Sequence, residues 1–419
     1  MSSPVPGVSA HKPRLRVLLL LALAAMLGMH AWVFFTLRQQ VRQGYPDFTA
    51  FYAAGKLVRG GQGAQLYKMD AQARAQQEFA SGVKIRNGPL PFTHPPFEAV
   101  LFAPLALLTY SSAYWLWNLV SLSALVGFLL LLRPELPQLR AWSEAVPFLA
   151  GLAFFPVFVC LLQGQDSLLL LLLFGLAFAA MKGDRDFLAG ICLGLALFRF
   201  QLVLPVMAVV LLRRRWKVAG GFAVAAAALV GISAGVVGWE QALKYPFELL
   251  QISRAQGAGA MNPQVMPNLR GAVSSLAGDG NLAHALIALI SLALVGLAAW
   301  KWKADPQQPG FDLGFALTLV MAVMVSYHIM AHDLSLLLIP LLLAAEWLLR
   351  QGAPGIGRRL VTAAISVLFL SPIYFLLWFR YQRFSLLFWV VALLALGLGL
   401  AVGGEEARPR AEAARNSGS

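Results

Sequence analysis

Charged residues are scarce in this sequence of 419 residues, where they make up 12% of the chain, against roughly 25% in soluble domains. The rest is strongly apolar, with 59% hydrophobic residues and a mean hydropathy of +0.70. About 20 consecutive apolar residues cross a bilayer as a helix, and such stretches recur from Leu15 to the C-terminal region. The composition therefore excludes a soluble domain with one anchor and predicts an integral membrane protein.

Several other features are rare or missing. The two cysteines, Cys160 and Cys192, lie inside apolar runs without metal-ligand spacing, so we expect reduced core residues. The glycines at Gly60, Gly61 and Gly63 follow no expected strand and precede no phosphate-loop Lys, which excludes a nucleotide-binding loop. Neither a serine-hydrolase elbow nor a zinc-protease motif is present. Lys and Arg outnumber Asp and Glu by 33 to 19, but no basic surface domain is present to bind nucleic acid.

The apolar stretches predict an all-α polytopic membrane protein with about 12 transmembrane helices. The expected spans are residues 15–37, 111–132, 146–163, 166–182, 186–199, 200–213, 216–238, 283–301, 311–330, 334–349, 360–378 and 384–402. With the N-terminus inside, basic connections such as Arg213 to Lys217 fall on the cytoplasmic side, where Lys and Arg are enriched. A rival threading takes 96–109 as a span and 187–212 as one helix, but it sends Arg133 and Lys182 outside.

The preferred threading also sets the domain organisation. We expect a cytoplasmic N-terminus at 1–14, a transmembrane domain at 15–402 with external loops at 38–110 and 239–283, and a disordered cytoplasmic tail at 403–419. Within the first loop, the apolar periodicity from Asp47 to Arg59 predicts a helix that lies in the membrane interface. The spans 186–199 and 200–213 are short, which favours half-helices that meet near Arg199.

Asp47 is the strongest candidate for chemistry. It opens the first external loop, where a lipid headgroup and a water-soluble acceptor meet. The alternative is structural, because Asp before an apolar-periodic run is a typical N-cap. The two roles are compatible.

Ionisable residues at membrane edges are costly and so indicate function. The informative ones are Asp166, Arg199, the pair Tyr327-His328 and the pair His332-Asp333. In the preferred threading all of them lie at external helix ends, on the same side as Asp47. They are therefore expected to converge on one site.

His328 and His332 are four residues apart and share one face of a helix. A metal site is disfavoured, because no third ligand has a convincing spacing. Hydrogen bonding to a phosphate or sugar is the preferred interpretation, and histidines satisfied between helices are the alternative. Arg199 and Arg270 are candidates for binding a lipid phosphate, since Arg binds phosphate oxygens bidentately, although either would also serve as a headgroup anchor.

Motifs between residue 45 and about residue 345 resemble glycosyltransferase family 87, whose members are membrane enzymes of the GT-C superfamily. The matching segments are Asp47-Phe48-Thr49-Ala50-Phe51-Tyr52-Ala53-Ala54-Gly55, Gly61 with Leu66-Tyr67, Thr93-His94-Pro95-Pro96-Phe97, Gly164-Gln165, Ala189-Gly190 with Gly194, Met266-Pro267-Asn268 with Arg270-Gly271, and Tyr327-His328 with His332-Asp333-Leu334. The first motif is fairly specific, and the later ones follow in the expected order.

The resemblance implies a GT-C fold with a catalytic carboxylate in the first external loop, here Asp47. It implies an inverting transfer of a sugar, mannose by analogy, from polyprenyl phosphate to a hydroxyl of a glycolipid or glycan on the extracytoplasmic side of the cell membrane. No metal or other cofactor is expected, since one phosphate needs less charge compensation than a diphosphate. The positions expected to bind substrate or phosphate are Arg199, where many relatives carry Lys, together with Arg270, His328, His332, Asp333, His94, Gln165 and Tyr52.

The main alternative function is a lipid or sugar transporter or flippase. Transporters typically show internal repeats and polar residues at the membrane midplane. This sequence shows no clear duplication, and its polar groups gather at one side, beside two sizeable external loops. Transfer chemistry is therefore favoured over transport.

Overall fold

The computed structural model describes residues 12–83, 88–245, 247, 262–278, 280–302, 305–308, 310–350 and 355–416. Within these ranges the regular structure is helical and no β-strand occurs. The α-helices are α1 (Lys12–Thr36), α2 (Arg38–Gln43), α3 (Phe48–Arg59), α4 (Met69–Ala80), α5 (Pro96–Phe102), α6 (Tyr110–Leu132), α7 (Pro137–Trp142), α8 (Val146–Ala153), α9 (Phe155–Gln163), α10 (Ser167–Lys182), α11 (Asp186–Leu195), α12 (Phe200–Leu212), α13 (Trp216–Val237), α15 (Leu269–Ala277), α16 (Asn281–Lys301), α17 (Phe311–Val325), α18 (Leu338–Leu349), α19 (Ile356–Leu368), α20 (Ser371–Phe375) and α21 (Leu387–Asn416).

Many of these helices have the length and composition of membrane spans. In the described part of the chain, seven helices are long and apolar enough to cross a bilayer, and the number rises to nine if two bent pairs are each one span. The bends are 58° between α8 and α9 and 65° after α19, and α10 and α17 are shorter apolar helices. The described part of the chain is thus all-helical, and the protein is a multi-pass membrane protein. The expected count of twelve spans is not confirmed.

The segment Asp186–Leu212 is the least regular of these candidate spans. A straight helix of 27 residues would hold its ends about 40 Å apart. However, Nη2 of Arg215, just beyond the segment, lies 2.8 Å from Oδ1 of Asp186 at its start. The chain therefore reverses at the short 3₁₀-helix η4 (Ala196–Arg199). This reversal matches the expected pair of half-helices meeting near Arg199.

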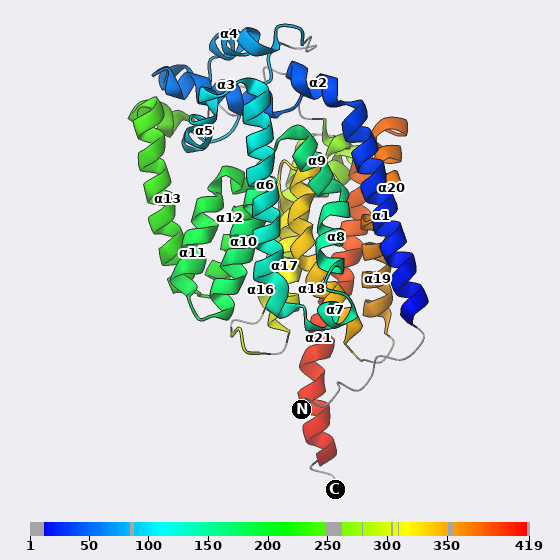
Figure 1. Ribbon diagram of the computed structural model, residues 1–419. Coiled ribbons are helices and arrows are strands. Elements are labelled where there is room, and N and C mark those ends of the chain that lie inside the picture. The colour runs from blue at the N-terminus through cyan, green and yellow to red at the C-terminus, as the bar shows by residue number, and fades with distance from the viewer. Residues whose placement is uncertain are drawn as a thin grey trace, which may run out of the picture.

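Figure 1 shows α2, α3, α4 and α5 together at one end of the helical bundle, with α7 at the other end. Helix α3 lies directly on the end of α5, because a Cβ atom at Gly55 would come within 2.4 Å of the carbonyl oxygen of Phe102. The rings of Phe51 and Phe102 stack at 4.7 Å in the same contact. The region 96–109 folds as α5 and the short η2 (Leu105–Leu107), so it does not form the span of the rival threading.

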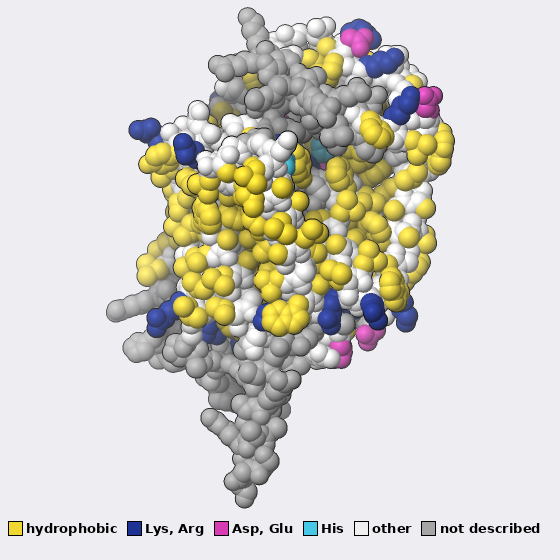
Figure 2. Space-filling model, turned by 180° about the vertical axis from the view of Figure 1, so that it is seen from behind, with side chains coloured by type: hydrophobic (Ala, Val, Ile, Leu, Met, Phe, Trp, Pro, Cys, Tyr) yellow, Lys and Arg dark blue, Asp and Glu magenta, His cyan; other side chains and the backbone are white. Residues whose placement is uncertain are grey.

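The surface of the bundle suits a lipid environment. Large apolar side chains such as Trp32, Trp115, Leu119 and Trp300 are exposed, and Figure 2 shows a broad hydrophobic belt with Lys and Arg gathered at its two rims. Such a belt matches the hydrocarbon core of a bilayer with charged residues at the headgroups. At the C-terminal end, α21 continues to Asn416, whereas the sequence analysis expects disorder from residue 403.

Candidate active site

Asp47 immediately precedes α3 at the end of the bundle formed by α2 to α5. Its backbone N–H donates a hydrogen bond to Oε1 of Gln163 over 3.1 Å, and its Oδ2 accepts one from Nε2 of Gln165 over 2.8 Å. The side chain makes no capping hydrogen bond to α3, although Asp47 stands at the N-cap position. The cap that the sequence allowed is therefore not formed, and the carboxylate faces the turn between α9 and α10 instead.

That turn is shaped by Gly164. Its φ is +62°, in the left-handed region that favours glycine. A Cβ atom there would lie 2.7 Å from Cβ of Phe48, the first residue of α3. The hydroxyl of Tyr114 anchors the preceding turn of α9 by donating to the carbonyl oxygens of Leu161 and Leu162. The close fit of the turn beneath α3 is what brings the amide of Gln165 to the carboxylate of Asp47.

Arg199 lies at the reversal between α11 and α12 and is only 5% exposed. Its Nε donates to Oδ1 of Asp166 over 2.9 Å, and its Nη2 donates to the same oxygen and to Oε1 of Gln165. Nε also lies 3.6 Å from Oδ1 of Asp333. Gln165 therefore connects Arg199 with Asp47, so that a buried guanidinium holds the amide that orients the carboxylate.

Asp333 and the two histidines come from the segment where η7 (Ala331–Leu337) begins. Oδ2 of Asp333 accepts a hydrogen bond from the backbone N–H of Met330 over 2.9 Å, and Nε2 of His332 lies 3.6 Å from its Oδ1. Burial lowers the pKa of His328 to about 4, so this imidazole is neutral at physiological pH. Its Nδ1 is buried without a hydrogen-bond partner. A neutral histidine of this kind can bind a polar substrate group.

His94 and Glu98 complete the cluster from the start of α5. Nδ1 of His94 lies 2.9 Å from Oε2 of Glu98, and the backbone carbonyl of His94 accepts from the hydroxyl of Tyr67 over 2.7 Å. One imidazole nitrogen of His94 and one carboxylate oxygen from each of Glu98 and Asp166 all lie within 4.8 Å of one another. The sequence analysis missed Glu98, although a lone carboxylate inside an apolar run is a signal for function.

Burial dominates the electrostatics of this cluster. It raises the pKa of Glu98 and of Asp166 to about 7 each, despite the opposing effect of Arg199. It also raises the pKa of Asp47, and the hydrogen bond from Gln165 and the charge of Arg199 oppose that rise. Burial lowers the pKa of His94 to about 4. A carboxylate with a raised pKa accepts a proton more readily than an ordinary Asp does.

The family model described as "Glycosyltransferase family 87" matches residues 92–326, more than half of the chain. The chain belongs to glycosyltransferase family 87.

Two similar proteins share one name, polyprenol-phosphate-mannose-dependent alpha-(1-2)-phosphatidylinositol pentamannoside mannosyltransferase. The protein from Mycolicibacterium smegmatis is 31% identical over 220 residues, which are 51% of this chain and 51% of the relative. The protein from Mycobacterium tuberculosis is 33% identical over 224 residues, which are 51% of this chain and 49% of the relative. The family 87 protein described here thus spans about half the length of the curated relatives that it matches. No solved structure matches it significantly.

Two other residues expected to bind substrate in this family 87 protein, Tyr52 and Arg270, are each held by contacts of their own. The hydroxyl of Tyr52 donates to the carbonyl oxygen of Leu108 over 2.7 Å, and its ring packs against Phe79. The guanidinium of Arg270 lies 4.2 Å from the centre of the Tyr327 ring, where it makes a cation–π contact. Tyr52 thus packs within the α3 end region, whereas Arg270 lies near the histidines that follow α17.

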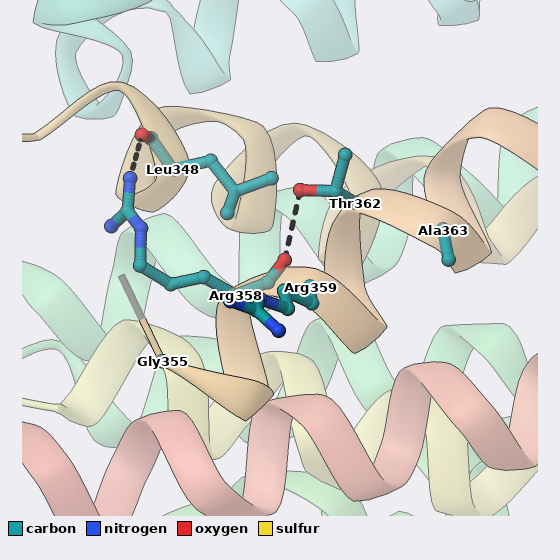
Figure 3. Close-up of a pocket in the computed structure, with 6 residues that line it drawn as sticks. All are labelled: Leu348, Gly355, Arg358, Arg359, Thr362 and Ala363. Atoms are coloured by element: carbon teal, nitrogen blue, oxygen red, sulfur yellow. Dashed lines mark hydrogen bonds between the residues drawn. The ribbon is translucent and has the colours of Figure 1, made fainter. Parts of the chain in front are cut away.

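A surface hollow lies elsewhere in the family 87 protein, at the start of α19. It is lined by Leu348, Gly355, Arg358, Arg359, Thr362 and Ala363, and Figure 3 shows Arg358 donating to the carbonyl oxygen of Leu348. Helix α19 starts at the end of the bundle opposite to α3 (Figure 1). Because Arg358 donates hydrogen bonds to the last carbonyl oxygens of α18, we interpret this hollow as part of the cap of that helix. We place the candidate active site around Asp47.

Proposed function

We propose that this family 87 protein is a membrane glycosyltransferase that moves a sugar from a polyprenyl-phosphate donor to an acceptor hydroxyl. The observation that carries the proposal is the carboxylate of Asp47, which is oriented by Gln165 and Arg199 at the membrane edge of an apolar helical bundle. The names of the two relatives support mannose as the sugar and a phosphatidylinositol-linked glycan as the kind of acceptor.

In the proposed reaction, Asp47 is the general base. It takes the proton of the acceptor hydroxyl while that oxygen attacks the anomeric carbon, and the bond from that carbon to the phosphate oxygen breaks. The configuration inverts in this single displacement. The polyprenyl phosphate leaves as an anion and needs no proton, so one carboxylate suffices, unlike the two that most glycosidases use.

The two arginines have different proposed roles. Arg199 contacts Asp166 and Gln165 and lies close to Asp333, so much of its charge is already balanced. We assign it the task of holding Gln165. Arg270 and His328 lie near each other, because Asn268 caps the helix of Arg270 and donates to the carbonyl of Ser326. We assign them the binding of the donor phosphate, with His332 and Asp333 beside them.

The site lies at one end of the bundle, together with α2 to α5. We place this end outside the cytoplasm, because the basic connections such as Arg213 to Lys217 mark the opposite end as cytoplasmic. In this orientation both termini are cytoplasmic. The donor sugar reaches the site on the outer face while its polyprenyl chain stays in the membrane.

The proposal is tested by supplying the purified protein in liposomes with radiolabelled polyprenyl-phosphate-mannose and a phosphatidylinositol mannoside acceptor. We expect label in a larger glycolipid, and no transfer from a nucleotide-linked mannose. A liposome in which the labelled donor crosses the bilayer without any new glycolipid would support the transporter alternative and contradict the proposal.

A further inference from the structure

The three side chains of His94, Glu98 and Asp166 form a compact group that the reaction above does not use. One carboxylate oxygen from each acid and one imidazole nitrogen lie within 4.8 Å of one another. A cation bound at 2.0 to 2.4 Å from each ligand needs ligand separations of about this size or less. His94 lies just before α5, Glu98 lies in α5 and Asp166 lies in the turn before α10, so the fold itself assembles them.

Two of the carboxylate oxygens in this group have no hydrogen-bond donor. Glu98 is 0% exposed and its Oε1 is unpartnered, while Asp166 is 1% exposed and its Oδ2 is unpartnered. The other oxygen of each acid is occupied, by His94 for Glu98 and by Arg199 for Asp166. A buried carboxylate oxygen without a partner is costly. A cation bound between the two acids would give these oxygens a partner.

Charge balance points the same way. The carboxylates of Glu98, Asp166 and Asp333 lie around the guanidinium of Arg199, and Asp47 is linked to it through Gln165. When all four acids are ionised, this one cation offsets only one of the four negative charges. A divalent cation would supply the positive charge that such a group of ionised acids lacks.

We propose that His94, Glu98 and Asp166 bind one divalent metal ion of the Mg²⁺ or Mn²⁺ class. Carboxylate oxygens are the preferred ligands of these ions, and one imidazole nitrogen favours Mn²⁺ over Mg²⁺. The site revises the expectation that no metal is involved. It rests on the proposed function only for its role, which is to place positive charge beside Gln165 and Asp47, where the anionic donor would enter.

Metal binding is tested without any donor, so its outcome is independent of the transferase proposal. Purified protein is stripped with EDTA, returned to metal-free buffer and titrated with Mn²⁺, and free Mn²⁺ is followed by electron paramagnetic resonance. We expect one saturable site, which Mg²⁺ displaces. Glu98→Gln is expected to weaken Mn²⁺ binding about tenfold or more, because the site loses a charged ligand. The matched control is Glu144→Gln, which changes an exposed glutamate paired with Arg133 and Arg140 and should leave binding unchanged.

The competing explanation is a single proton shared between Glu98 and Asp166. Under that explanation, wild type shows no saturable Mn²⁺ site. The side-chain amide of Glu98→Gln would then donate the hydrogen bond that the shared proton supplies, and Mn²⁺ binding would not change. Either the absence of a wild-type site or unchanged Mn²⁺ binding in Glu98→Gln overturns the proposal. Folding of each variant is checked by its elution from size-exclusion chromatography in detergent, and Asp166→Asn provides a second ligand variant if Glu98→Gln elutes as an aggregate.

Discussion

Replacing Gln165 by leucine should shift the pH dependence of sugar transfer. Gln165 donates to Oδ2 of Asp47 over 2.8 Å, and this hydrogen bond stabilises the ionised carboxylate. Burial raises the pKa of Asp47, and the hydrogen bond from Gln165 opposes the rise. Removing the donor therefore raises the pKa of Asp47 further. A general base works only when deprotonated, so the rate falls as the pH drops through this pKa.

The size of the shift follows from the strength of the lost hydrogen bond. A hydrogen bond to a charged group contributes about 1.5–3 kcal/mol, and one pKa unit corresponds to about 1.4 kcal/mol. Gln165→Leu should therefore move the acid limb of the kcat/KM profile to higher pH by about one to two units. Above that limb, the rate should recover toward a plateau, lowered only by the poorer alignment of Asp47.

The assay measures kcat/KM for mannose transfer across the pH range for wild type, Gln165→Leu and Gln163→Leu. Gln163 is the matched control, because it accepts a hydrogen bond from the backbone N–H of Asp47 rather than donating to the carboxylate. Its replacement should lower the plateau and leave the acid limb in place. An acid limb that stays at the wild-type pH in Gln165→Leu would refute the assignment of Asp47 as the base that Gln165 tunes.

Three further changes probe the surroundings of the site. Arg199→Met leaves buried carboxylates unpaired and should lower the free energy of unfolding by about 3–5 kcal/mol. Denaturant titration in detergent measures this loss, and the double variant that adds Asp166→Asn should recover part of it. An unfolding midpoint equal to that of wild type would contradict the buried ion pair. Gly164→Ala places a Cβ against Phe48 at a left-handed φ and should cost about 1–3 kcal/mol in the same titration, whereas no loss would show that the turn relaxes freely. Tyr52→Phe removes a hydroxyl that donates a hydrogen bond to a backbone carbonyl. It should keep kcat/KM within about threefold of wild type and lower the free energy of unfolding by about 1 kcal/mol. A loss of kcat/KM well beyond threefold would place Tyr52 at the substrate.

The sequence was sufficient to predict the class of the protein and much of the neighbourhood of its site. Apolar run length alone identifies a multi-pass helical membrane protein, because lipid leaves few alternatives to the helix. Polar residues at the ends of such runs must collect near a membrane surface. The structure does bring Asp166, Arg199 and Asp333 into contact, and Gln165 adjoins them. The family resemblance is confirmed by the match over residues 92–326.

Other features depend on tertiary contacts that no local pattern reveals. Glu98 lies in an apolar stretch, and its nearness to Asp166 joins residues far apart in the chain. Tyr52 shares a helical face with Phe48, but its hydroxyl turns to the carbonyl of Leu108. The number of spans is also not fixed by run length, since Asp186–Leu212 is long enough for one span and yet reverses near Arg199, as the two short predicted spans indicated. Length and periodicity report local structure, whereas the contacts of Glu98 and Tyr52 are decided by packing.

The most direct test of the whole account is the transfer assay with Asp47→Asn. The assay gives the same labelled polyprenyl-phosphate-mannose and acceptor to wild type, to Asp47→Asn and to the control Asp70→Asn, and it measures donor binding alongside. Asp70 is a suitable control because it is an exposed aspartate paired with Arg74. The account predicts that Asp47→Asn loses transfer by about 10²-fold or more while it still binds the donor, and that Asp70→Asn behaves as wild type. Transfer by Asp47→Asn at the wild-type rate would contradict it.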